Sequence, residues 1–144
     1  KNGEGDRYFC KDGKIQRESD DGSRDSRYPK EDGHELDVPL AVLVNGNSAS
    51  ASEVFTGAVM DYDAGIVVGT TTFGKGIVQN LIPLGDGTAI KLTTAHYYTP
   101  NGFDLHGKGL EPDVVVEMDG ELQKKAVVEL SEDNQLQAAI EAMN

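Results

Sequence analysis

The stretch VPLAVLVNGNSASASEVFTGAVMDYDAGIVVG, residues 38–69, decides the fold of this chain. It opens with an almost unbroken apolar run, residues 38–44, which is typical of a strand buried on both faces in a parallel sheet. Over residues 51–62 apolar side chains then recur at helical spacing. These side chains are Val54, Phe55, Ala58 and Val59. Residues 63–65 end the helix, and residues 66–69 return as a short buried strand. The order strand, helix, strand predicts parallel pairing with a right-handed crossover, and therefore an α/β fold.

The sequence that follows predicts three more strands and one more helix. The expected elements are a hairpin of residues 77–82 and 89–99 that turns at 85–87, a turn at 100–102, a strand at 114–116 and a helix at about 131–143. The last helix would place Leu136, Ala139 and Ile140 on one face, and residues 131–134 offer several N-terminal caps.

Residues 1–36 differ in composition from the rest, being polar and rich in Asp, Ser, Gly and Arg. Within them we expect a hairpin over residues 6–17 that turns at Asp12-Gly13, followed by an exposed loop over residues 18–35. The chain is therefore divided into a polar, loop-rich or hairpin extension, residues 1–36, and a folded part, residues 37–144.

Length and charge exclude several classes of protein. The 144 residues fit one domain, and no apolar run approaches the roughly 18 residues of a membrane span. A formal charge of −12 argues against a nucleic-acid or anionic-membrane surface, since both require clustered Lys and Arg. The single cysteine, Cys10, cannot form an intrachain disulfide. The first residues show no signal peptide.

Ser50 lies in the run Asn47-Ser48-Ala49-Ser50-Ala51-Ser52-Glu53, between the first strand and the helix. Its spacing to Glu53 matches a capping box, so the simplest interpretation is a helix cap. The alternative is a nucleophile, because open α/β sheets place ligands at the carboxyl ends of their strands. The N–H of Ala51 would then point toward a tetrahedral oxyanion. Ser48 and Ser52 compete with Ser50 for this role.

Lys75, between Gly74 and Gly76, is the candidate base. It is one of only three basic residues between positions 38 and 123. An ordinary lysine is almost entirely protonated near pH 7, but burial can lower its pKa by about 3 to 5 units. If residues 75–79 are extended, Gln79 lies on the same face and can hold the amine by a hydrogen bond. An exposed loop lysine and an ordinary strand glutamine are the alternatives.

Three blocks of this sequence resemble the C-terminal processing (tail-specific) peptidases, which are Ser-Lys serine proteases of bacteria and plastids. The resemblance covers roughly residues 38–117. The blocks are VLVNGNSASASE (42–53), VG with TFGKGIVQ (68–69 and 72–79), and GKGLEPD (107–113). The resemblance implies that residues 37–144 are the C-terminal part of a peptidase domain. It also implies that their fold is a Clp protease/crotonase-like core with strand-helix-strand units and a hairpin.

The resemblance also assigns roles. By the family pattern Ser50 is the nucleophile, Lys75 the general base and Gln79 the residue that supports Lys75, while Asp61 matches an acidic position that supports activity in some members. No metal or organic cofactor is implied. Members are usually exported, which implies a periplasmic, cell-envelope or extracellular place, and they cleave proteins recognised by an unstructured C-terminal tail.

One departure from the family pattern lies before the nucleophile. Family members carry there a PDZ-like substrate domain and a strand whose Asn/Gly-rich loop gives a second oxyanion donor. Neither is visible here, so we expect a fold that is incomplete at its N-terminal side, and a chain that is weakly active or inactive alone. An open sheet edge also allows a homo-oligomer.

Other functions compete with this one. Residues 69–75 nearly spell a phosphate-binding loop, but Gly76 replaces the hydroxyl residue and a strand, not a helix, should follow. His96 or His106 are alternative bases for a serine triad. The histidines and Cys10 show no metal-ligand spacing. A non-catalytic interaction or assembly module on the same fold is the main alternative to an enzyme.

Overall fold

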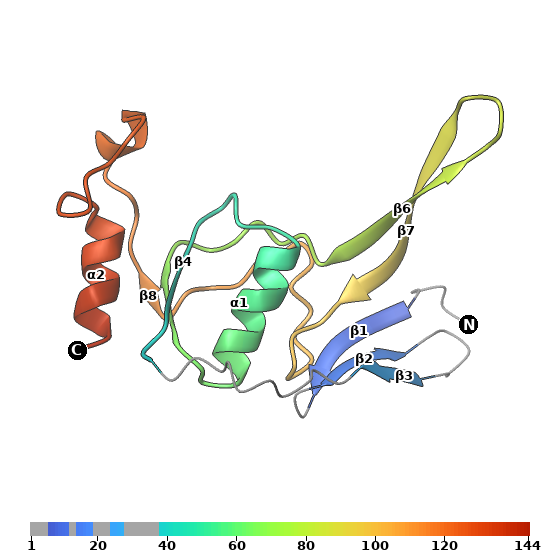
Figure 1. Cartoon of the computed structure of the whole chain (residues 1–144), viewed down its shortest axis with the longest axis horizontal. Helices are drawn as coiled ribbons and strands as arrows, with labels where there is room; N and C mark the ends of the chain where they lie inside the picture. Colours follow the sequence, from blue (N-terminus) through green and yellow to red (C-terminus); the bar gives the residue numbers. More distant parts are fainter. Residues whose placement is uncertain (1–5, 12–13, 19–23, 28–37) are drawn as a thin grey trace.

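The computed structural model describes residues 6–11, 14–18, 24–27 and 38–144 of the chain. Its centre is a three-stranded parallel sheet with the strand order β4-β5-β8. These strands are β4 (Ala41–Val44), β5 (Ile66–Gly69) and β8 (Val114–Val115). Helix α1 (Ala51–Asp61) lies on one side of this sheet and helix α2 (Asn134–Ala142) on the other (Figure 1). The expected strand-helix-strand unit is confirmed, with Ala41 opposite Ile66 and Val44 opposite Gly69.

The first strand is shorter and less buried than the sequence predicts. Strand β4 begins at Ala41, and Leu43 remains 43% exposed, so burial on both faces was wrong. The sheet order explains the difference, because β4 is an outer strand and β5 lies in the middle. The burial predicted for the strand at residues 66–69 is confirmed, since Val67 and Val68 of the central strand have no exposed surface. Val67 packs with Val44 and Val59 as the core.

Helix α1 has the predicted length, but its buried face is more polar than its apolar pattern indicates. Phe55, expected in the core, is 55% exposed. The buried residues are Glu53, Thr56, Gly57 and Val59. A Cβ at Gly57 would lie 2.8 Å from Cγ2 of Thr99, so the helix approaches the end of β7 very closely there. The buried side of α1 therefore carries Glu53, whose contacts are described with the candidate site.

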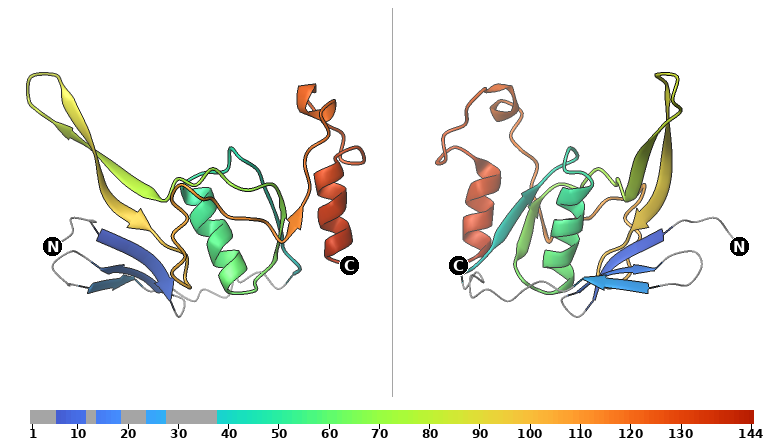
Figure 2. Two further views of the ribbon diagram at one scale, coloured as in Figure 1. Left: turned by 180° about the vertical axis from the view of Figure 1, so that it is seen from behind. Right: turned by 45° about the vertical axis from the view of Figure 1, so that its right-hand side comes forward.

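A second sheet has the order β3-β2-β1-β7-β6. Its strands are β1 (Asp6–Lys11), β2 (Lys14–Glu18), β3 (Arg24–Arg27), β6 (Ile77–Pro83) and β7 (Ala89–Tyr97). Both predicted hairpins are confirmed, β1 with β2 and β6 with β7; the turn of the first lies outside the described residues. The tip of the β6–β7 hairpin extends away from the rest of the molecule in every view (Figure 2).

The expected exposed loop over residues 18–35 is wrong in part, since β3 pairs antiparallel with β2. A polar sequence can form such a strand because an outer strand needs only backbone hydrogen bonds to one neighbour. The rest of that loop lies outside the described residues, apart from Glu18 at the end of β2.

The C-terminal segment contains the short helix η1 (Leu122–Lys124) and α2. Helix α2 starts three residues later than expected, at the N-cap Asp133, whose Oδ1 accepts hydrogen bonds from the N–H groups of Gln135 and Leu136 at 3.0 Å. Its buried residues are Gln135 and Ala139, whereas Ile140 is exposed, so the expected inner face was only partly right. In the described part of the chain, no helix has the length and apolar character required to cross a membrane.

Candidate active site

Ser50 occupies the N-cap of α1 with an unusual backbone conformation. Its φ of 58° and ψ of −113° lie in a region that favours glycine. Such a conformation costs on the order of 1–3 kcal/mol and occurs often at functional sites. The side chain is half-buried at the carboxyl end of β4, where the α/β fold is expected to bind ligands. The predicted capping box with Glu53 is also present, and a catalytic role of Ser50 stays a prediction.

Strain at Ser50 predicts a difference between two variants that both remove its hydroxyl group. Ser50→Gly should be more stable to unfolding than Ser50→Ala by about 1 kcal/mol, because only glycine adopts this φ without strain. Urea unfolding of the two proteins measures the difference. Equal stabilities would mean that the backbone relaxes and that no strain is stored at position 50.

Glu53 connects the start of α1 to the loop that carries Lys75. Its carboxylate has no exposed surface and accepts four hydrogen bonds. Oε2 accepts from the backbone N–H of Ser50 at 2.9 Å and from that of Lys75 at 2.8 Å. Oε1 accepts from Oγ1 of Thr72 and from the N–H of Gly74, both at 2.6 Å. One oxygen atom therefore joins the backbones of the two residues predicted as nucleophile and base.

These contacts also set the ionisation of Glu53. Burial raises the pKa of the carboxyl group, but the hydrogen bonds from Thr72, Gly74, Ser50 and Lys75 together outweigh it, so the pKa lies below its ordinary value. The charged form is the one that the folded protein stabilises. Since the pKa is lower in the folded than in the unfolded chain, this contribution is fully present above the unfolded pKa and is lost as the pH falls through the folded one.

A pH-dependence of stability follows. The free energy of unfolding of the natural protein should exceed that of Glu53→Gln most at neutral pH, and the difference should shrink below about pH 4.3, the ordinary pKa of glutamate. Urea unfolding of both proteins between neutral pH and pH 3 measures it. A difference that stays constant with pH would contradict a charged Glu53 in the fold.

The glycines beside Lys75 are required by the way its loop packs. Gly74 has a φ of 83°, and a Cβ there would lie 2.8 Å from the backbone nitrogen of Gly109. A Cβ at Gly76 would lie 2.9 Å from the backbone nitrogen of His106. The segment Gly74-Lys75-Gly76 thus packs directly on residues 106–109. Residues 107–113, which are the third block that resembles the family, therefore support the loop of the second block, residues 72–79. Lys75 is half-buried in that loop.

Gln79 and Ala51 are placed as follows. Gln79 is exposed on β6, where its Nε2 lies 3.4 Å from Oγ1 of Thr93. Strand β6 begins only at Ile77, so Lys75 is not in the strand and the extended-face argument does not apply to it. The support of Lys75 by Gln79 stays a prediction.

The N–H of Ala51 has no hydrogen-bond partner in the described part of the chain, as an oxyanion donor requires.

Asp61, at the end of α1, holds a turn in place. Its Oδ2 accepts a hydrogen bond from the backbone N–H of Asn101 at 2.7 Å. The predicted turn at residues 100–102 is confirmed, with the N–H of Gly102 bonded to the carbonyl oxygen of Thr99. Thr99 in turn packs against Gly57 of α1. The structure thus gives Asp61 a fold-supporting contact, while an effect on activity stays a prediction.

This contact predicts how two substitutions of Asp61 differ. Asp61→Ala should lower the free energy of unfolding by about 1 kcal/mol, because the N–H of Asn101 loses its acceptor. Asp61→Asn keeps a carbonyl oxygen and should lose less than half of that. Chemical denaturation measures both, and equal losses would show that charge, not the hydrogen bond, matters at this position.

The competing residues have other contacts. The hydroxyl of Ser48 accepts a hydrogen bond from the N–H of Asn45 at 3.1 Å, as part of a turn. Ser52 is exposed on the first turn of α1. The rings of His96 and His106 lie edge to face, 5.7 Å apart, beside the Lys75 loop. Neither shows a hydrogen bond to Ser50 in the described residues.

The phosphate-binding interpretation is contradicted by two findings. Residues 77–83 form the strand β6, where a nucleotide-binding loop needs a helix. The N–H groups of Gly74 and Lys75, which would have to cradle a phosphate, already bond to the carboxylate of Glu53.

The sequence interpretation missed the role of Glu53 and of its partner Thr72. A Ser-x-x-Glu pattern indicates only a capping box, and nothing local shows that the same carboxylate reaches residues 72–75. A signal was nevertheless present, because an acidic residue on the buried side of a helix almost always has a bonding partner there. Glu53 is spaced with Gly57 on one side of α1, which is the face that the structure buries.

Comparison with known proteins identifies the family of this chain. The sequence profile of peptidase family S41 matches residues 4–116. A carboxy-terminal-processing protease of Bartonella bacilliformis is 54% identical over 79 residues, which are 55% of this chain and 18% of that protein. A Staphylococcus epidermidis protein named "Probable CtpA-like serine protease" is 52% identical over 80 residues, 56% of this chain and 16% of that protein. The chain thus spans less than a fifth of the length of these relatives.

Solved structures agree as well. The photosystem II D1 C-terminal processing protease has a TM-score of 0.56 and 40% identity, over 67% of this chain and 24% of that one. A Bacteroides fragilis protein assigned to the S41 proteases has a TM-score of 0.57 over 72% of this chain and 27% of that one; at 19% identity, this likeness shows the fold alone. The family profile covers most of the chain, including residues 48–53 and 72–76 that Glu53 joins, and this chain belongs to peptidase family S41.

Proposed function

We propose that this chain is part of a serine endopeptidase of the C-terminal processing type, with Ser50 as nucleophile and Lys75 as general base. The observation that supports this most is the bridge made by Glu53. The backbone nitrogens of Ser50 and Lys75 bond to the same carboxylate oxygen, so they are no further apart than two hydrogen bonds laid end to end. Residues that are 25 positions apart in the sequence are thereby adjacent in space.

The chemistry follows the usual course of covalent catalysis. Lys75 takes the proton of the Ser50 hydroxyl as Oγ attacks the peptide carbonyl carbon, and it returns that proton to the leaving amine. The N–H of Ala51 donates to the oxyanion of the tetrahedral intermediate. Water then hydrolyses the acyl-enzyme, with Lys75 again as base. Gln79 is proposed to orient Lys75 during both steps.

Further properties are proposed from the family relationship. The core is of the Clp protease/crotonase type, substrates are proteins with exposed C-terminal tails, and a PDZ-like domain of the longer protein selects them. The same relationship supports an exported protein and allows a homo-oligomer. These properties concern the longer protein, whereas the contacts of the candidate site lie within residues 38–144.

We also propose that the 144 residues alone are weakly active or inactive, because the peptidase chemistry needs a second oxyanion donor that we do not identify among them. Hydrolysis of an unfolded protein by this chain and by the full-length natural protein tests both proposals. The full-length protein should be active, with its activity abolished by Ser50→Ala. Robust Ser50-dependent turnover by the short chain would overturn the second proposal. An inactive full-length protein that still captures a partner would indicate an interaction module instead.

A further inference from the structure

A polar cavity of about 540 Å³ lies at the carboxyl ends of β4 and β5. Its lining residues are Asn45, Asn47, Thr70, Glu117, Met118, Gln123 and Gln135. All except Met118 are polar, and the volume is in the range of roughly 300–1,000 Å³ that is usual for ligand sites. The site described above does not use any of these side chains, and none of them is Lys, Arg or His.

The hydrogen bonds of the lining occupy donors of both glutamines, and the Oδ1 of Asn45 accepts the N–H of Asn47 at 2.9 Å. Gln135 is only 6% exposed, and its Nε2 donates to the carbonyl oxygen of Val116 at 2.6 Å. The Nε2 of Gln123 donates to the carbonyl oxygen of Met118 at 3.0 Å. In the part of the chain that the structure describes, no group donates to the Oε1 of either glutamine. Each of these two amide groups therefore keeps its Oε1 available as an acceptor for a ligand.

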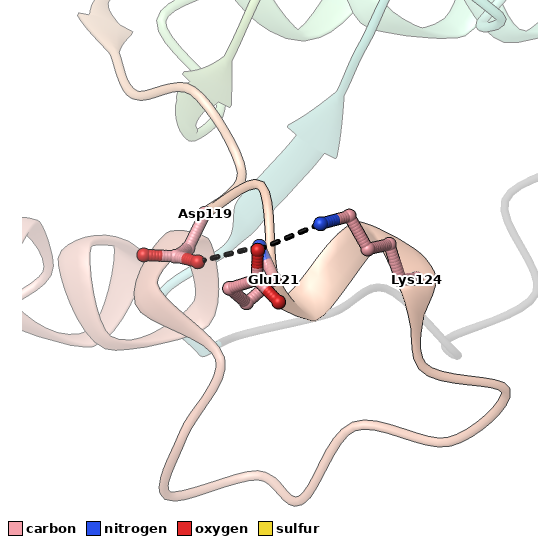
Figure 3. A network of polar contacts seen from close by, with 3 residues as sticks. All are labelled: Asp119, Glu121 and Lys124. Carbon is pink, nitrogen blue, oxygen red and sulfur yellow. Dashed lines mark hydrogen bonds and ion pairs between the residues drawn. The ribbon is translucent and has the colours of Figure 1, made fainter.

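Among the residues that line the cavity, only Glu117 carries a charge, and it is negative. Glu117 supplies the carboxylate of the cavity, and no hydrogen bond or ion pair to its side chain is found in the described residues. The neighbouring carboxylates have partners of their own, as Figure 3 shows: Glu121 pairs with the amine of Lys124 at 2.7 Å, and Asp119 accepts the N–H of Glu121. Acceptor oxygens around one unpaired carboxylate favour a ligand that is cationic and has several N–H donors.

The cavity is close enough to Ser50 to receive a side chain of the same substrate. Asn47 precedes Ser50 by three residues, so their Cα atoms lie at most about 11 Å apart. An extended peptide advances about 3.3 Å per residue, so about three residues span even the upper limit of that distance. The opposite wall comes from Glu117, Met118, Gln123 and Gln135, which lie beyond the part that matches the family profile.

We propose that this cavity is a specificity subsite that binds a lysine or arginine side chain of the substrate, two or three residues from the bond that is cleaved. The inference rests on the proposed peptidase function and adds a substrate preference to it. It concerns residues near the cleaved bond and is separate from recognition of a C-terminal tail. Because half of the wall lies outside the family match, the preference would be a property of this chain.

Binding of Nα-acetyl-lysine methylamide to the full-length protein, measured by saturation-transfer NMR at low salt, tests the proposal. The lysine derivative should bind saturably, and its norleucine counterpart, which lacks the amine, at least tenfold more weakly. Glu117→Gln should weaken lysine binding at least fivefold. Glu121→Gln, a nearby carboxylate outside the cavity, should change it less than twofold. Equal binding of both derivatives, or no effect of Glu117→Gln, would overturn the proposal.

This measurement does not depend on catalysis, so it separates the inference from the proposed function. Mapping of the cuts in an unfolded protein adds a second result. Lys or Arg should be enriched two or three residues from the cut, and Glu117→Gln should remove the enrichment. Cuts without such enrichment contradict the subsite and leave the peptidase intact, whereas an absence of cuts contradicts the peptidase and leaves the binding measurement to decide on the cavity.

Discussion

Lys75→Met should reduce the hydrolysis of an unfolded protein by the full-length natural enzyme by about 10³-fold, because general-base catalysis contributes 10²–10⁴-fold. Methionine keeps an unbranched side chain of similar length and removes the amine, so the Gly74-Lys75-Gly76 loop should keep its packing on residues 106–109. The loss should appear in kcat, since the amine acts on the reacting atoms, with KM nearly unchanged.

The sequence offers a matched control in Lys108, which also lies between two glycines. Its amine lies over the ring of Phe103, 5.2 Å from the ring centroid, in the loop that supports the Lys75 loop. Lys108→Met should therefore keep activity within about threefold, since a cation–π contact at an exposed site is worth only about 0.5–1 kcal/mol. If Lys75→Met keeps the natural rate, or if both variants lose activity equally, Lys75 is not the base.

Glu53→Gln should destabilise the fold by about 3 kcal/mol and lower kcat/KM by more than 100-fold. The carboxylate accepts four hydrogen bonds from donors that are all turned toward it, and an amide would place its own N–H₂ group against some of them. Buried donors without acceptors are costly, and the backbones of Ser50 and Lys75 would no longer be joined. Urea unfolding and steady-state kinetics measure the two effects.

The effect of Glu53 on activity must be separated from its effect on stability. Activity is therefore compared at a temperature where both proteins are folded. Glu111→Gln, a change of an exposed carboxylate, should alter stability by less than about 0.5 kcal/mol. If folded Glu53→Gln retains the natural kcat/KM, the carboxylate is only a stabilising group, and the positioning of Ser50 and Lys75 does not depend on it.

Local patterns in the sequence predicted the elements that carry the site. The strand-helix-strand unit, both hairpins and the start of α1 at Ser50 follow from periodicity, capping residues and glycine turns, which are local properties. The same local patterns could not show which strand is central. An apolar run predicts a buried strand wherever it lies, so burial was predicted for residues 38–44 and for residues 66–69, but only the central strand β5 has it.

The parts that could not be predicted depend on contacts between distant residues. The apolar side chains of α1 indicated one buried face, yet hydrogen bonds from Thr72, Gly74 and Lys75 bury Glu53 on another. Similarly, Gln135 is buried in α2 because its amide bonds to Val116, 19 positions earlier, and no helical period contains that information. Strand β3 was missed because its sequence is polar. It is held by pairing with β2, and backbone pairing leaves no pattern in the sequence.

The most direct test of the central claim is the identity of the residue that becomes acylated. The full-length protein is incubated with a slowly hydrolysed peptidyl p-nitrophenyl ester, quenched in acid, and mapped by mass spectrometry. We expect an acyl group on Ser50 that is absent in Ser50→Ala and forms about 10³-fold more slowly in Lys75→Met. An acyl group on Ser48 or Ser52, or hydrolysis of a protein substrate that continues in Ser50→Ala, would contradict it.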